Sequence, residues 1–136
     1  MVKTRYLFIS HSWSYGDAYT RLCNLLNQAS CFSYLNYSVP QDDPIHNASN
    51  QQALRNAIMR QINNTQIVLV IAGIYATYSK WINIELDLAK RHFSKPVLGI
   101  KPYAQTNVSS AVRNNADLIV PWSTASIVSG IRQLVP

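Results

Sequence analysis

Glu85 is a carboxylate residue in a segment whose other residues follow the pattern of a helix with one apolar face. The segment Trp81–Phe93 reads WINIELDLAKRHF, and at about 100° per residue its apolar side chains share one broad arc. Glu85 falls near the middle of that arc, between Trp81 and Ala89. A carboxylate is almost never buried without a partner or a purpose. The pattern alone leaves two interpretations about equally open, a functional acid or a structural glutamate that is partly exposed or paired with an arginine.

Polar residues also gather where strand-like segments end. His11 and Ser12 follow the first such segment, and Tyr37 and Ser38 stand at the end of the second. The helix that contains Glu85 follows the third. In open parallel sheets, ligands bind outside the carboxyl ends of the strands. A carboxylate in the first turns of that helix therefore faces the predicted cleft, which favours the functional interpretation of Glu85.

The elements that must position these residues alternate along the chain. Strand-like segments are expected at 5–10, 32–37, 66–72, 96–100 and 117–120. Helical spacing is present at 15–27, 54–62, 81–93 and 123–134, whereas 101–115 reads as irregular or weakly helical. Because strands alternate with helices, we expect an α/β fold of the flavodoxin-like, three-layer kind, with a five-stranded parallel sheet flanked by helices. Length predicts a single domain over residues 1–136.

The composition limits the class of partner. The net charge of +6 comes from 12 basic and 6 acidic residues, scattered along the chain. Because there is no Lys/Arg stripe, the sequence argues against nucleic-acid binding, and the surplus charge suits an anionic small ligand as well. The longest apolar run, around 67–72, is too short to span a membrane. Cys23 and Cys31 lack CxxC spacing, so we expect reduced thiols in a cytoplasmic protein.

Several familiar sites are excluded by the residues present. The four glycines form neither a dinucleotide-binding fingerprint nor a P-loop. The third strand runs into Ala72-Gly73, where a phosphate-accepting receiver domain needs an aspartate. The histidines, including His11 and His92, lack metal-binding spacing, so no metal is expected. His92 lies two turns beyond Glu85 on the same predicted face, and we expect it to pack there or to line a polar rim.

Three blocks of the sequence together resemble the TIR domain. They are FISHSW at 8–13, NYSVPQDDPIH at 36–46 and IAGIYATYSKWINIELDLAK at 71–90. More narrowly, they are similar to the TIR-like proteins of the bacterial Thoeris anti-phage system, the ThsB family. The resemblance covers essentially the whole chain, and it is the combination of blocks that is specific, since WxxxE alone is not.

The resemblance implies an enzyme that cleaves NAD at the nicotinamide–ribose bond. NAD is then the substrate, no cofactor is required, and the product is a cyclic or conjugated ADP-ribose signal that activates a partner effector after a phage-derived trigger. The catalytic glutamate of TIR enzymes corresponds to Glu85. The residues that correspond to the substrate-binding site are Phe8, Ser10, His11, Ser12, Tyr37, Ser38, Pro40 and Trp81. The second-strand loop, about 38–50, matches the family's BB loop, through which TIR enzymes often form homo-oligomers.

The residues agree with this chemistry. Loss of nicotinamide develops positive, oxocarbenium-like charge on the ribose, as in glycoside hydrolysis. One carboxylate held against that ribose stabilises the cation as it forms, and an apolar surround strengthens the interaction by excluding water. Nicotinamide leaves without protonation, so a second catalytic acid is not needed. By residue type alone, Phe8 and Trp81 are more often core residues than ligand platforms.

Two other functions stay open at this point. The first is a non-catalytic TIR scaffold in the same defence system, because many TIR domains are adaptors, and Glu85 would then be structural. The second is a nucleoside-type glycosyl transferase of the same fold class. Turnover of nucleosides without turnover of NAD would favour the second.

Overall fold

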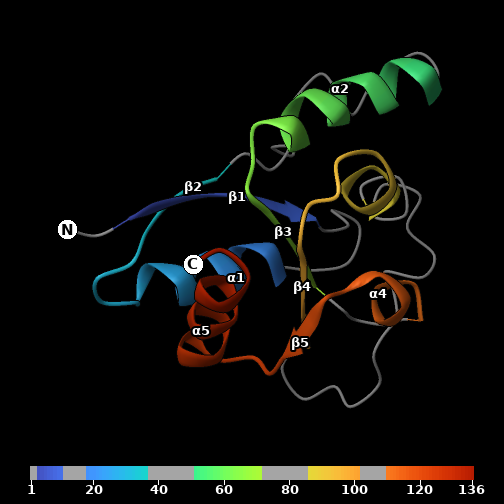
Figure 1. The fold of residues 1–136 in the computed structure, drawn as a ribbon. Coiled ribbons are helices and arrows are strands. Elements are labelled where there is room, and N and C mark those ends of the chain that lie inside the picture. Colours follow the sequence, from blue (N-terminus) through green and yellow to red (C-terminus); the bar gives the residue numbers. More distant parts are fainter. Residues whose placement is uncertain (1–2, 11–17, 37–50, 72–85, 102–109) are drawn as a thin grey trace.

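The structure, a computed structural model, describes residues 3–10, 18–36, 51–71, 86–101 and 110–136, which form a five-stranded sheet with helices on both faces (Figure 1). The strands are β1 (Thr4–Ser10), β2 (Ser33–Asn36), β3 (Ile67–Ile71), β4 (Val97–Ile100) and β5 (Leu118–Val120). Each pair of neighbours is parallel, and the order across the sheet is β2-β1-β3-β4-β5. The predicted parallel sheet of five strands is confirmed.

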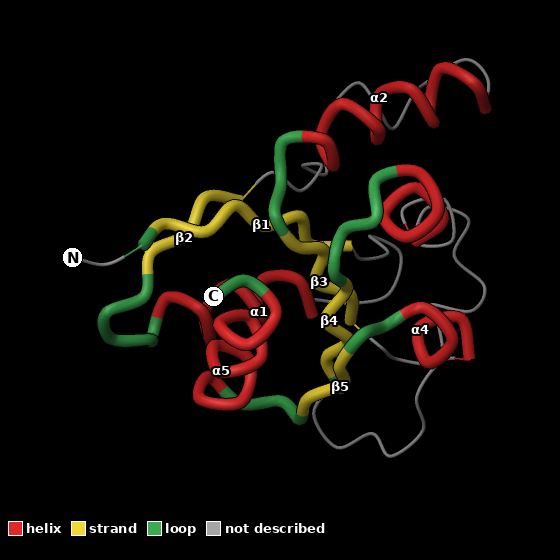
Figure 2. Tube along the Cα trace, in the orientation of Figure 1, coloured by secondary structure: helices red, strands yellow, loops and turns green. Residues whose placement is uncertain are grey.

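The helices form the two outer layers. One face of the sheet carries α1 (Ala18–Asn27) and α5 (Thr124–Leu134), which pack against each other (Figure 2). The other face carries α2 (Gln51–Asn63), the π-helix η3 (Leu88–His92) and α4 (Ser110–Asn115). The predicted three-layer arrangement is therefore correct. The segment 101–115, expected to be irregular or weakly helical, contains α4 at its end.

Side chains that alternate along each strand divide the core into two halves. In β1, Leu7 and Ile9 belong to the cluster under α1 and α5, whereas Phe8 belongs to the cluster under α2 and η3. All five residues of β3 are buried. Such a strand must be apolar at every position because both faces of it are covered. The continuous apolar run in the sequence therefore marks the centre of the sheet.

Gly99 lets α4 approach the sheet closely. A Cβ atom at this position would lie 3.0 Å from Val112 Cγ1 and 3.2 Å from Ile119 Cγ1. Val112 is fully buried in the cluster that also contains Val97. A side chain at position 99 would therefore push α4 outward or force Val112 to move.

The helix expected at Trp81–Phe93 differs from a regular α-helix in its last turn. Leu86, Leu88 and Ala89 are buried, as the apolar arc predicts. However, the N–H of Phe93 donates to Leu88 O, five residues back, at 3.0 Å. A π-turn advances less around the axis per residue than an α-turn, so residues late in it leave the α-helical arc.

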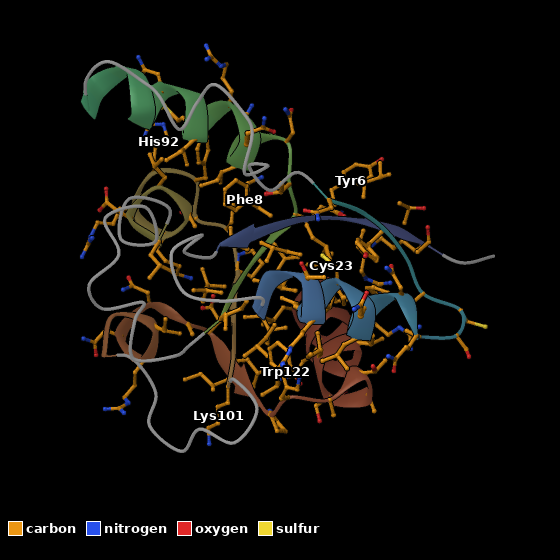
Figure 3. The ribbon with its side chains drawn as sticks, turned by 180° about the vertical axis from the view of Figure 1, so that it is seen from behind. Tyr6, Phe8, Cys23, His92, Lys101 and Trp122 are labelled. Carbon is orange, nitrogen blue, oxygen red and sulfur yellow. The ribbon has the colours of Figure 1, made fainter. Side chains whose placement is uncertain are left out.

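His92 is the last residue of this π-helix. Its side chain is exposed, with its ring 4.6 Å from that of Phe93 in an edge-to-face arrangement. Of the two predicted positions for His92, packed in the apolar face or at a polar rim, the exposed side chain agrees with the second. Figure 3 labels His92 on the α2 side of the sheet.

Candidate functional site

The strand order creates one place where neighbouring strands lead the chain in opposite directions. After β1 the chain passes to β2 on one side, and it then crosses to β3 on the other side of β1. The boundary between β1 and β3 is therefore the topological switch point of the sheet. In folds with this strand order, ligands bind in the crevice outside the carboxyl ends of the two strands that flank it.

The two strands at this switch point lead into the two sequence blocks that carry most of the predicted site. Ser10, the last residue of β1, pairs in register with Val70 of β3. The segment 11–17 follows β1 and contains His11 and Ser12, and the segment 72–85 follows β3 and contains Trp81 and Glu85. Both segments therefore begin at the same edge of the sheet, as the sequence predicts.

The structure describes only part of the predicted site. Ser10 is placed through its backbone at the end of β1. The predicted residues that lie outside the described ranges are His11, Ser12, Tyr37, Ser38, Pro40, Trp81 and Glu85. Their roles stay predictions, and so does the homo-oligomeric contact through the BB loop at about 38–50.

Phe8 is the one predicted site residue whose side chain is described. It is fully buried within β1 and belongs to the same hydrophobic cluster as Val68, Val70 and Leu86 (Figure 3). Its ring therefore helps to fix β1 beneath α2 and η3. The contact of Phe8 with a ligand stays a prediction, whereas its place in the core is observed.

The helix residue that follows Glu85 in the chain is also part of this cluster. Leu86 is 1% exposed, and Leu88 and Ala89 are completely buried. Phe93, at the end of the same segment, packs against the cluster while it is half-buried. The described part of the predicted catalytic helix is thus attached to β1 and β3, the two strands at the switch point.

An ionic contact fixes the far end of this helix. Lys90 Nζ lies 2.7 Å from Asp117 Oδ2, and the same oxygen accepts the N–H of Val97 at 2.8 Å. Burial of Asp117 opposes ionisation, but the hydrogen bonds from Lys90 and Val97 and the charge of Lys90 outweigh it and lower the pKa of the carboxyl. Asp117 thereby connects η3 to the starts of β4 and β5.

Sequence reasoning did not identify this contact or the burial of Arg5. Arg5 is 8% exposed, and its Nε donates to Val135 O at 2.8 Å. Both contacts join residues that are distant in the chain, and no periodic pattern signals them. They lie at the amino ends of the strands and therefore stabilise the edge opposite the predicted site.

Three further expectations concern metals, membranes and thiols. Within the ranges that the structure describes, no three His, Cys, Asp or Glu side chains are grouped as metal ligands. Over the same ranges, no helix has the length and apolar character needed to cross a membrane. Cys23 and Cys31 are both free, the first half-buried and the second exposed.

Two solved structures share this fold. A pilus assembly-related protein from Burkholderia pseudomallei matches with a TM-score of 0.54 and 13% identity, over 98% of this chain and 89% of that one. The response regulator domain of Thermotoga maritima CheB matches with a TM-score of 0.54 and 12% identity, over 96% of this chain and 95% of that one. At such low identity the likeness shows the fold alone, in agreement with the predicted flavodoxin-like class.

The comparison of sequences is more specific. No curated protein matches the chain. The profile of a protein family, described as Thoeris protein ThsB, TIR-like domain, matches residues 8–107. This stretch includes the end of β1, the whole of β2, β3 and β4, and all three blocks that suggested the resemblance. The chain belongs to the family of TIR-like domains of the Thoeris protein ThsB.

Proposed function

We propose that this TIR-like domain cleaves NAD between nicotinamide and ribose and releases a cyclic or conjugated ADP-ribose signal. The main support for the proposal is the strand order. Because of this order, the segments that contain His11 and Glu85 follow the two strands at the switch point. The chain also belongs to the ThsB family. The crevice outside such strands is where this class of fold binds nucleotides.

In the proposed reaction, Glu85 acts on the ribose. As the bond to nicotinamide breaks, positive charge develops on the sugar, and the carboxylate stabilises that charge while it holds the ribose hydroxyls. The bonding electrons leave with nicotinamide, which becomes neutral and needs no acid. Trp81 would stack on a ring of the dinucleotide, and Ser10, His11 and Ser12 would bind it near the end of β1.

The identity of the product depends on the nucleophile that reaches the ribose. Water gives ADP-ribose, a group of the same nucleotide gives a cyclic isomer, and a second molecule gives a conjugate. We propose that the signal then activates a separate effector protein in infected cells and that the chain acts in the cytoplasm. The segment after β2 that contains Tyr37, Ser38 and Pro40 would line the mouth of the site and contact a second copy.

The proposal is tested by nicotinamide release. The full chain is incubated with NAD, with and without extract from phage-infected cells, and nicotinamide is quantified for the wild type, Glu85→Gln and Asp87→Asn. Asp87 is a matched control, because it is an acid two residues further along the chain that is paired with Arg91 at 2.7 Å. We expect Glu85→Gln to lose about 100-fold or more in rate, and Asp87→Asn to keep the wild-type rate.

The scaffold alternative predicts a different pattern in cells. If the chain only binds other proteins, Glu85→Gln protects cells from phage as well as the wild type does, whereas Pro40→Ala combined with Asp43→Ala abolishes protection. Full protection by Glu85→Gln, together with unchanged nicotinamide release, would reject the enzymatic proposal.

A further inference from the structure

A hollow lies between the end of α1 and the outer surface of α5, in the helical layer opposite η3. Its volume is about 520 Å³, which is within the range of small-molecule sites. The lining residues are mostly small, and they are Gln28, Ala29, Ser30, Thr124, Ala125, Val128, Ser129 and Arg132. Because alanine and serine occupy positions where longer side chains would close the gap, the surface stays concave.

Arg132 is held at this hollow by two contacts. One guanidinium nitrogen, Nη2, donates to Cys31 O at 2.9 Å, and the guanidinium carbon lies 5.8 Å from the centroid of the Phe32 ring. Cys31 itself has a φ of 54°, a left-handed conformation that is uncommon for a residue other than glycine. A guanidinium has five N–H donors, so most remain for a ligand, and a positioned arginine loses less entropy on binding.

The described segments that form the layer of Arg132 contain no acidic residue. The stretches 18–36 and 118–136, which supply α1, β2, β5 and α5, contain neither Asp nor Glu. The two acids within the described ranges, Asp87 and Asp117, are paired with Arg91 and Lys90 of the other layer. Among the described residues, the two acids are thus already paired and do not compete for Arg132.

We infer that this hollow binds a small organic anion, with its phosphate or carboxylate head on Arg132 and its apolar body on the alanine and valine side chains. The arginine fork is suited to both kinds of head group because it can donate two parallel hydrogen bonds. Hydroxyl groups of Ser30 and Ser129 line the same hollow and can donate to the remaining oxygens. The site does not depend on Glu85 or on NAD cleavage.

The test uses three probes that share an aromatic body. Phenyl phosphate and benzoate carry the two possible heads, and benzyl alcohol carries no charge. Each is titrated into the full chain while backbone amide shifts are followed by NMR. We expect saturable binding of at least one anion with a Kd below about 10 mM, with the largest shifts at residues 28–30 and 124–132. The tighter anion identifies the preferred head.

Variants separate this site from general attraction to a basic protein. Arg132→Gln is expected to weaken the anion about tenfold or more. Arg113→Gln removes the same charge from α4 in the other layer and is expected to leave the Kd unchanged. Ala125→Leu fills the hollow with a good helix former at an exposed position, so binding is lost while the fold remains.

Three results would overturn the inference. They are the absence of saturable binding of both anions, shifts that map elsewhere on the protein, and equal affinity of wild type and Arg132→Gln. Binding of benzyl alcohol as tight as that of the anions would also contradict the assigned role of Arg132.

Discussion

The two edges of the sheet differ in how the chain meets them. At the amino edge, polar contacts fix the segments that enter the strands. Asp117 accepts hydrogen bonds from Lys90 and from the N–H of Val97, and Arg5 donates to Val135 O. At the carboxyl edge, β1 and β3 lead into the two segments that carry His11 and Glu85. The observed polar contacts and the proposed chemistry therefore lie at opposite edges of the sheet. Substitutions can therefore change one without the other.

Phe8 gives the strongest test of this difference between the two edges, because it is predicted for the site but is buried in the core. Phe8→Ala is expected to lower the free energy of unfolding by about 3–5 kcal/mol, because it leaves a cavity beneath α2 and η3. Chemical denaturation measures the loss. Phe32→Ala, at a half-buried ring, is the matched control and should cost less. If Phe8→Ala lowers the free energy of unfolding by less than about 1 kcal/mol, Phe8 is not a core residue, and its predicted contact with a ligand is favoured instead.

Gly99 tests the packing that lies between the two edges. Gly99→Ala is expected to cost about 1–3 kcal/mol, because the new methyl group meets Val112 Cγ1 at 3.0 Å. Adding Val112→Ala makes room for it, so the double variant should be more stable than the sum of the two single changes predicts. Thermal unfolding of the four proteins measures this coupling. Simple additivity would contradict the close approach of α4 to β4.

Asp117 tests whether the amino edge of the sheet affects stability without affecting the proposed reaction. Asp117→Ala removes two hydrogen bonds at a partly exposed site and is expected to lower stability at neutral pH by about 1 kcal/mol. Nicotinamide release per folded molecule should not change. An altered rate would mean that the amino edge also takes part in the chemistry.

The pH dependence of the same pair has a defined sign. The folded-state pKa of Asp117 is lowered, so its contribution is fully present above its unfolded-state pKa. The contribution is lost as the pH falls below about 4 and through the folded-state value. The difference in melting temperature between wild type and Asp117→Ala should therefore shrink between neutral pH and pH of about 3. A difference that grows on acidification would contradict the assignment.

The smallest effect is expected at Asp87. Its pair with Arg91 spans one helical turn, and the arginine side chain is 75% exposed. Asp87→Asn should cost about 0.3–0.5 kcal/mol at low salt and less at high salt. Urea titrations at two salt concentrations measure it. A loss of several kcal/mol would show that the end of the helix is more strongly coupled to the fold than its exposure indicates.

The layers and strand directions were predictable because the burial of each helix or strand determines which of its positions are apolar. The run Ile67–Ile71 is apolar at every position because helices cover both faces, and it formed the central strand as expected. The family was predictable because three blocks of the sequence resemble those of TIR-like proteins and occur in the same order along the chain. Each of these signals depends on neighbours in the sequence.

What the sequence did not predict depends on contacts across the fold. The π-helix at Leu88–His92 is one such feature, because WINIELDLAKRHF reads as an unbroken α-helical pattern. The pairing of Lys90 with Asp117, and of Arg5 with Val135 O, joins residues far apart in the chain. The role of Phe8 was left between core and ligand platform because an aromatic residue suits both, and burial places it in the core.

The most direct test of the central claim is mass spectrometry of small molecules from phage-infected cells that express the wild type or Glu85→Gln at equal levels. We predict that the wild type accumulates nicotinamide and an ADP-ribose derivative during infection, whereas Glu85→Gln accumulates neither. If the Glu85→Gln cells produce the same derivative in the same amount, Glu85 is not the catalytic group and the account is contradicted.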